Sequence, residues 1–99
     1  MEYLAHKFYL RPTYFKMGFF NVPVAASKYY GRDKESIEIY CGDSKEPIIG
    51  YINRNANKTD APRIMGAVKL RDWFQNNFEI NDEMKVTIVN STKIRIHKA

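Results

Sequence analysis

The sequence predicts a mainly β fold with two short helices (α+β), arranged as a seven-stranded open pseudobarrel. Three observations predict it: short segments alternate apolar and polar residues, turn residues separate these segments, and helical signals are confined to two short stretches. Closure into a barrel is favoured because it leaves fewer bare strand edges than an open sheet. With 99 residues, 44% of them hydrophobic, the chain suits one core, so we expect residues 1–99 to form a single domain.

The first third of the chain predicts two strands and one helix. Residues 3–10 are rich in aromatic side chains and predict a strand, which Pro12 interrupts because proline cannot donate to the strand ladder. An extended segment restarts over residues 19–22. A proline and a glycine then bracket residues 24–30, which predicts a short helix there.

The middle of the chain predicts a hairpin followed by a loop. Residues 36–41 and 47–53 alternate apolar and polar side chains, and the residues between them have the composition of a turn. Cys41, the single cysteine, belongs to this alternation, which favours a buried strand residue over a reactive thiol. Residues 53–62 contain three asparagines and no large apolar side chain, which predicts an exposed loop.

The last third predicts a short strand, the second helix and a closing hairpin. After an extended segment at residues 63–65, large apolar residues recur at helical spacing, so we expect a helix over residues 69–77 with its aromatic face in the core. Residues 84–88 and 94–96 then alternate on either side of an Asn-Ser-Thr turn.

Basic residues are concentrated in two separate segments. The chain carries 16 Lys and Arg against 11 Asp and Glu, and this net charge of +5 is by itself only a weak indicator of a polyanionic partner. Residues 1–31 hold four basic residues and one acid, and residues 48–71 hold five and one. Residues 32–47 are net acidic and residues 72–99 are balanced. A fold that brings the two basic segments together would create a basic surface.

Residues for catalysis or metal binding are sparse. One cysteine and two distant histidines, His6 and His97, are too few for a structural zinc site, and no phosphate-binding glycine pattern occurs. Glu83 and Lys85, with Asp72 upstream, resemble the Mg²⁺ core of many nucleases, but Asp72 falls on the predicted helix and Glu83 in a turn that enters a strand. We therefore expect no catalytic residue, no metal and no cofactor.

The chain also lacks signals for membranes or secretion. No run approaches the roughly 20 apolar residues that span a bilayer, and the first seven residues lack the apolar stretch of a signal peptide. We expect a cytoplasmic protein.

Two predicted loops, residues 11–21 and 53–63, carry side chains that suit DNA. Arginine and lysine pair with guanine or phosphate, asparagine with adenine, and aspartate accepts from cytosine. The same composition also suits a loop that is merely solvated, and composition alone does not separate the two interpretations. The candidate DNA-binding residues are Arg11, Thr13, Tyr14, Lys16 and Asn21 in the first loop, and Asn53, Arg54, Asn55, Asn57, Lys58, Thr59, Asp60 and Arg63 in the second.

Motifs along nearly the whole chain match one family when they are taken together. They are Tyr9–Thr13, Phe20–Pro23, Arg63–Gly66, Leu70–Phe74, Asp82 and Val86–Val89. In this order they resemble the DNA-binding pseudobarrel, known as the B-three domain in plant transcription factors, and its relatives in restriction endonucleases of the EcoRII, BfiI and NgoFVII types. The restriction-enzyme branch is the closer match, through Gly18–Pro23 and Thr59–Gly66. The plant branch differs by a longer and more basic second arm.

The resemblance implies two arms that enter the major groove of duplex DNA like a wrench. Carried over by position, residues 11–21 are the N-terminal arm and residues 53–66 the C-terminal arm, and these segments coincide with the charge excess. The implied function is the target-recognition domain of a restriction endonuclease, or a freestanding relative, with nuclease chemistry in a separate domain or subunit. Arg11, Lys16, Arg54, Lys58 and Arg63 would contact phosphate and guanine, and Asn21, Asn55, Asn57 and Asp60 would discriminate bases.

Two other functions remain open on the sequence. An aromatic pocket for a modified or flipped base would use Tyr14, Phe15, Phe19 and Phe20. A protein-interaction module would instead present the two basic loops to an acidic partner.

Overall fold

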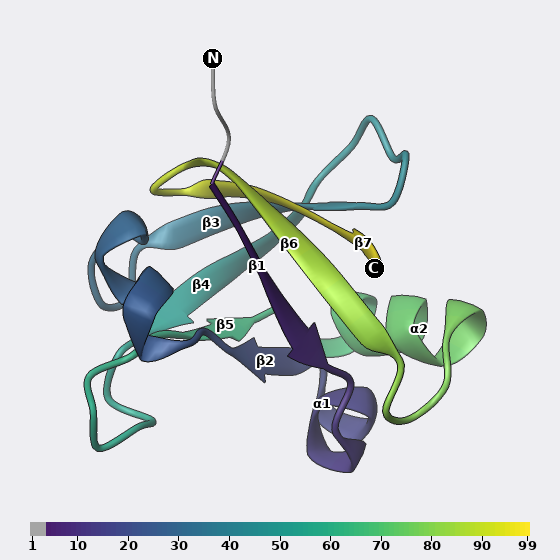
Figure 1. Ribbon diagram of the computed structural model, residues 1–99. Coiled ribbons are helices and arrows are strands. Elements are labelled where there is room, and N and C mark those ends of the chain that lie inside the picture. Colours follow the sequence, from purple (N-terminus) through teal and green to yellow (C-terminus); the bar gives the residue numbers. More distant parts are fainter. Residues whose placement is uncertain (1–3) are drawn as a thin grey trace.

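The computed structural model describes residues 4–99, which form seven strands and three short helices (Figure 1). The strands are β1 (Leu4–Tyr9), β2 (Phe19–Asn21), β3 (Ser36–Cys41), β4 (Ile48–Asn53), β5 (Arg63–Met65), β6 (Glu83–Asn90) and β7 (Lys93–Lys98). The helices are α1 (Pro12–Met17), the 3₁₀ helix η1 (Val24–Tyr29) and α2 (Ala67–Asn77). The predicted start of the first strand at Tyr3 lies outside the described residues.

The seven strands form one sheet in the order β1-β6-β7-β3-β4-β5-β2, which curls into a nearly closed barrel (Figure 1). Every neighbouring pair is antiparallel except β3 and β7, which run parallel. The edges of the sheet are β1 and β2, where the barrel stays open. The predicted α+β pseudobarrel with seven strands is therefore confirmed.

Alternate side chains of the strands fill the barrel. Phe20 on β2, Ile52 on β4 and Ile64 on β5 are all fully buried, so their sequence neighbours on these strands face outward. The rings of Phe8 and Phe20 stack in the centre with centroids 4.4 Å apart. Phe74 of α2 is also fully buried, which confirms that this helix docks by its aromatic face.

The segment after β1 is a helix, and the prediction of a loop over residues 11–21 is wrong. Pro12 occupies the first helical position, where its missing N–H costs nothing, so it begins α1 as well as ending the strand. Tyr14 and Phe15 pack against the core and hold the helix in place. Gly18 ends α1 in the left-handed region, with φ 76°, and donates to the carbonyl of Tyr14.

The other sequence predictions need smaller adjustments. The short helix expected at residues 24–30 is present as η1, and the last two strands extend one to two residues beyond the predicted ends. Cys41 lies at the end of β3 and is half-buried, and this burial raises the pKa of its thiol to about 12. Within residues 4–99, no helix has the length and apolar character needed to cross a membrane.

Candidate nucleic-acid interface

The outer faces of β4, β5 and β2 form a small floor that carries a row of polar residues. In the strand register Arg63 on β5 stands opposite Asn53 on one side and Asn21 on the other. These three residues, named here the polar row, face away from the core because the residues next to them along the strands are buried. Three strands that are distant in sequence thus place an arginine between two amides.

The two polar segments of the chain leave opposite ends of this floor. The N-arm, residues 11–18, enters β2 at Phe19, whereas the C-arm, residues 54–62, joins Asn53 to Arg63 at the other end. Both arms project from the same lower side of the barrel (Figure 1). The floor between them is three residues long, or roughly 10 Å at a strand rise of about 3.3 Å. That span is close to the roughly 12 Å width of the major groove.

Arg54 is turned beneath the C-arm, and its side chain is committed to protein acceptors. Its Nε donates to the carbonyl of Gly31 at 2.8 Å, and its Nη2 donates to the carbonyls of Ser27 and Tyr30 at 2.9 and 3.0 Å. Its Nη1 donates to Ser27 Oγ at 2.9 Å and to the carbonyl of Asp60 at 3.1 Å. Contrary to the sequence prediction, the arrangement of Arg54 fits a brace between η1 and the C-arm, because its donors are already used.

The asparagines of the C-arm also shape the arm. Asn55 Nδ2 donates to Asp33 Oδ2 at 2.9 Å, and the backbone N–H of Asn55 donates to Asn53 Oδ1 at 2.9 Å. Asn57 Nδ2 donates to the carbonyl of Ala61 at 3.0 Å and to Asn21 Oδ1 at 3.2 Å. With its oxygen engaged, Asn21 has only its amide N–H groups left to offer a base, which rules out the bidentate contact that adenine favours unless these bonds open.

The tip of the C-arm is exposed and polar, as the loop prediction expected. Lys58, Thr59 and Asp60 are all exposed. Asp60 adopts a left-handed φ of 63° and donates its N–H to the carbonyl of Asn57 at 3.3 Å, which closes a tight turn at the tip. The cation of Lys58 is thus held on a short turn away from the barrel.

Arg63 is positioned from two sides, in contrast to Arg54. Its Nε donates to Asn21 Oδ1 at 3.0 Å, and its guanidinium carbon lies 4.3 Å from the ring centroid of Phe19. Within residues 4–99, the two terminal amino groups of Arg63 make no hydrogen bond to a protein acceptor. A guanidinium that is oriented in this way retains the pair of donors that binds guanine O6 and N7, or a phosphate, in a bidentate manner.

The N-arm presents its polar side chains to solvent and its aromatic side chains to the core. Arg11, Thr13 and Lys16 are exposed, and the Arg11 guanidinium lies 5.5 Å from the ring centroid of Tyr9. Tyr14 is half-buried, and its ring centroid lies 5.4 Å from that of Phe19. Of the predicted residues in α1, Tyr14 therefore mainly supports the arm, while Arg11, Thr13 and Lys16 are open to a partner.

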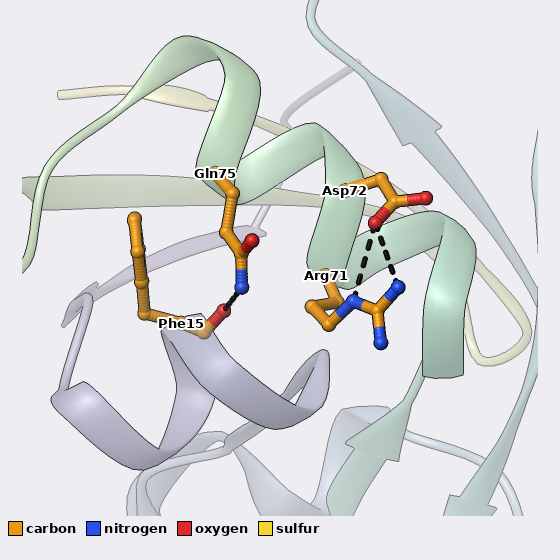
Figure 2. Close-up of polar contacts among 4 residues, drawn as sticks. All are labelled: Phe15, Arg71, Asp72 and Gln75. Atoms are coloured by element: carbon orange, nitrogen blue, oxygen red, sulfur yellow. Dashed lines mark hydrogen bonds and ion pairs between the residues drawn. The ribbon is translucent and has the colours of Figure 1, made fainter.

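Helix α2 fixes the direction of the N-arm. Gln75 Nε2 donates to the carbonyl of Phe15 at 2.9 Å (Figure 2). One turn earlier on the same helix, Arg71 and Asp72 form an ion pair at 3.0 Å that Figure 2 also shows. Gly18 packs so closely on α2 that a Cβ atom there would lie 2.0 Å from the carbonyl oxygen of Ala67. The end of α1 is thus locked against the start of α2.

The aromatic residues considered for a flipped base are covered by other side chains. Phe20 is fully buried, and Phe19 is 7% exposed beneath Arg63 and Tyr14. Tyr14 and Phe15 are half-buried and pack against the same cluster. Because these four rings are packed against other side chains, their arrangement argues against an open pocket for a base.

The residues considered for catalysis or metal binding lie apart. Glu83 begins β6 and pairs with Lys7 at 3.4 Å, whereas Asp72 pairs with Arg71 on α2. Over residues 4–99, no three His, Cys, Asp or Glu side chains gather closely enough to hold a metal ion. His6 Nε2 lies 2.6 Å from the hydroxyl of Tyr30, and burial lowers the pKa of the imidazole.

The sequence reasoning missed residues that support or complete the floor. Asp33 holds the C-arm by accepting from the backbone N–H of Arg54 at 2.8 Å and from Asn55. No local signal marks this role, because its partners are 21 and 22 residues away in the chain. Met65 and Tyr51 share the outer face with the polar row, and here the period of two along β4 and β5 could have found them.

Comparison with known proteins adds information on the fold. No protein-family model and no curated protein matches this sequence. Among solved structures, a hypothetical protein of Arabidopsis thaliana is similar with a TM-score of 0.68 at 6% identity, covering 99% of this chain and 91% of that one. The N-terminal domain of Helicobacter pylori LlaJI.R1 is similar with a TM-score of 0.66 at 10% identity, covering 93% and 77%. At these identities the likeness shows that the chain shares their fold.

Proposed function

We propose that this chain is a sequence-specific binding domain for double-stranded DNA that holds the major groove between its two arms and has no catalytic activity of its own. The observation that carries the proposal is the arrangement of the N-arm and the C-arm at the two ends of a floor roughly 10 Å long. Two polar projections at that spacing match the width of the groove, and the oriented Arg63 lies on the floor next to the C-arm.

The proposal assigns different tasks to the side chains on this surface. Arg63 contacts a guanine edge, because it stands on the central strand of the floor and, within residues 4–99, its two terminal amino groups make no hydrogen bond to the protein. Arg11, Lys16 and Lys58 contact phosphates on either side, because they are exposed on the arms. Asp60 and the remaining N–H groups of Asn21 contribute to base discrimination.

The sequence resemblance to recognition domains of restriction endonucleases and the fold shared with the LlaJI.R1 domain point the same way. The proposed setting is therefore a cytoplasmic restriction system, in which a nuclease domain or subunit supplies the chemistry. The protein in isolation would bind a site without cutting it. In this proposal it needs no metal or cofactor, since arginine, lysine and amide groups suffice for groove recognition.

Selection from a random duplex library at near-physiological salt tests the proposal. We expect enrichment of one short site, and an affinity for it that falls linearly with the logarithm of salt concentration by about 0.9 per phosphate contact. Single-stranded forms of the same site should bind more weakly. Failure to enrich any duplex, together with no salt-dependent duplex affinity, would reject the proposal and favour an acidic protein partner instead.

A further inference from the structure

A second row of outward-facing residues lies beside the polar row and is apolar. In the strand register Met65 on β5 stands opposite Tyr51 on β4 and Phe19 on β2. These three residues, named here the apolar row, lie two positions along each strand from the polar row and therefore face the same side of the sheet. Phe19 is the member of this row nearest the N-arm, because it directly follows α1 and Gly18 in the chain.

Two members of the apolar row, Tyr51 and Met65, are not needed to fill the core. Phe20, Ile52 and Ile64 on the same three strands are fully buried and already face the barrel interior. In the apolar row, by contrast, Tyr51 keeps 45% of its surface exposed and Met65 is only partly covered. Exposed apolar side chains in register on adjacent strands are a common mark of a surface that is covered by a partner.

The position of the apolar row identifies what would cover it. The row lies on the floor between the two arms, and the Arg63 guanidinium lies over the ring of Phe19 at 4.3 Å. A duplex that is held between the arms with a base edge on Arg63 must therefore pass over Met65 and Tyr51. The row contains no charged residue, and apart from the Tyr51 hydroxyl its side chains are apolar, so it offers a base mainly apolar contact.

We infer that the apolar row reads the 5-methyl group of a pyrimidine, thymine or 5-methylcytosine, next to the base pair that Arg63 contacts. This inference rests on the proposed function. The 5-methyl group is the apolar feature that a base presents in the major groove, and proteins recognise it by apolar contact. Adjacent rows on a strand are about 6.6 Å apart, which spans about two base-pair steps at 3.4 Å each. The methyl-reading position therefore lies within two base pairs of that guanine.

Duplexes that differ by single methyl groups test the inference. Every base pair contains one pyrimidine, so each position of the selected site can be changed either from thymine to uracil or from cytosine to 5-methylcytosine. At one position we expect removal of the methyl group to weaken binding about fourfold, or its addition to strengthen binding about fourfold, as for one buried methyl group. The two kinds of change distinguish a thymine reader from a 5-methylcytosine reader.

Variants of the floor connect that effect to the apolar row. In Met65→Ser and Tyr51→Thr the affinity ratio between the methylated and unmethylated duplexes should fall to about one, whatever the change in overall duplex affinity. Tyr51→Thr provides a test at an exposed position should Met65→Ser fold poorly. The matched control is Val89→Thr on β6, which is 44% exposed and should leave the ratio unchanged.

The possible failures can be told apart. If duplexes bind but no methyl change alters affinity at any position, or if both floor variants retain the ratio, the inference is overturned and the proposed function stands. If no duplex binds at all, the proposed function fails and the inference fails with it.

Discussion

The two arms occupy equivalent places beside the floor but are held by different kinds of interaction. The N-arm is a helix whose end is pressed against α2, where Gly18 leaves no room for a side chain. The C-arm has no regular structure. Four of the five hydrogen bonds of Arg54 tie its base to η1, Tyr30 and Gly31, and the fifth joins it to Asp60 within the arm. Backbone packing positions one arm, whereas side-chain hydrogen bonds, most of them from Arg54, position the other. The arms should therefore fail in different ways when their supports are removed.

Gly18→Ala should have the largest effect, because it removes the support of the N-arm. The new Cβ would lie 2.0 Å from the carbonyl oxygen of Ala67 and would also force a non-glycine residue into a φ of 76°. Backbone strain of this kind costs about 1–3 kcal/mol, and the clash with backbone adds to it, so we expect a loss on the order of 4 kcal/mol. Urea denaturation followed by tryptophan fluorescence measures this loss.

Gly42→Ala separates the two contributions to the Gly18→Ala effect. Gly42 also has a positive φ, 59°, but a Cβ there would meet only Trp73 at an ordinary 3.8 Å. We expect a loss of about 1–2 kcal/mol from the left-handed conformation alone. Equal losses at the two glycines would show that α1 does not need its close contact with α2.

Arg54→Met should have the next largest effect and act on the C-arm. The variant keeps an unbranched apolar stem but removes five hydrogen bonds, four of them to backbone carbonyls. At about 0.5–1.5 kcal/mol for each net bond, with some acceptors regaining water, we expect a loss of about 3 kcal/mol. Arg54→Lys should recover little, because an ammonium group cannot reach acceptors spread around a planar fork.

The same denaturation experiment on Arg32→Met supplies the control for Arg54. Arg32 is exposed on the neighbouring loop. In the described structure its backbone N–H donates to Glu35 Oε1, whereas its guanidinium makes no hydrogen bond to the protein. Its replacement should change stability by less than about 0.5 kcal/mol. Hydrogen exchange should also show faster exchange in residues 54–62 of Arg54→Met, and an unaltered C-arm would argue against the bracing role.

The arms also differ in how far the sequence could predict them. The C-arm was predictable as an exposed loop because three asparagines and no large apolar residue leave nothing to bury. The N-arm helix was not, since α1 has only six residues and Pro12 signals a strand end as well as a helix start. The strands could be predicted from alternating apolar and polar residues, because this pattern is contained within each strand and does not depend on distant residues.

The roles of the two central arginines were hidden for a related reason. Arg54 and Arg63 look alike in the sequence, as basic residues at the two ends of one polar loop. They differ because Arg54 meets acceptors 23–27 residues earlier in the chain, whereas Arg63 meets Asn21 and Phe19 across β2. Such long-range partners follow from barrel closure, which composition and spacing do not describe.

Arg63→Ala should separate recognition from bracing. We expect duplex affinity to fall by about 1–3 kcal/mol and specificity to relax at one position, as for loss of a base-reading arginine. Stability should change by only about 1 kcal/mol, since the half-buried side chain loses one hydrogen bond, to Asn21, and its contact with the Phe19 ring. Equal affinity losses for every duplex sequence would instead make Arg63 a phosphate contact.

Acid should weaken the support of the C-arm but not that of the N-arm. His6 bonds to the hydroxyl of Tyr30, whose carbonyl accepts from Arg54, and burial lowers the pKa of His6 below its usual 6.5. The unfolded chain therefore binds a proton more readily than the folded one. The stability associated with neutral His6 is complete above about pH 6.5 and is lost as the pH falls from there through the folded-state pKa.

Urea midpoints at pH 7.5 and pH 5.5 measure this loss. His6→Gln keeps a hydrogen-bonding side chain that does not titrate, and it should flatten the difference between the two midpoints. A wild-type midpoint that does not fall in acid would contradict the predicted direction.

Lys16→Ala and Lys58→Ala should have the smallest effects on duplex affinity, and these effects should be the same for every sequence. Each removes one exposed cation from one arm, so affinity should fall alike for all duplex sequences and the salt slope should flatten by about 0.9. Lys45→Ala is the charge-matched control, because Lys45 lies in the turn at the Ile48 end of β4, whereas the C-arm leaves the Asn53 end. If only one arm variant changes the slope, that arm alone touches the phosphate backbone, and the two arms differ in function as well as in construction.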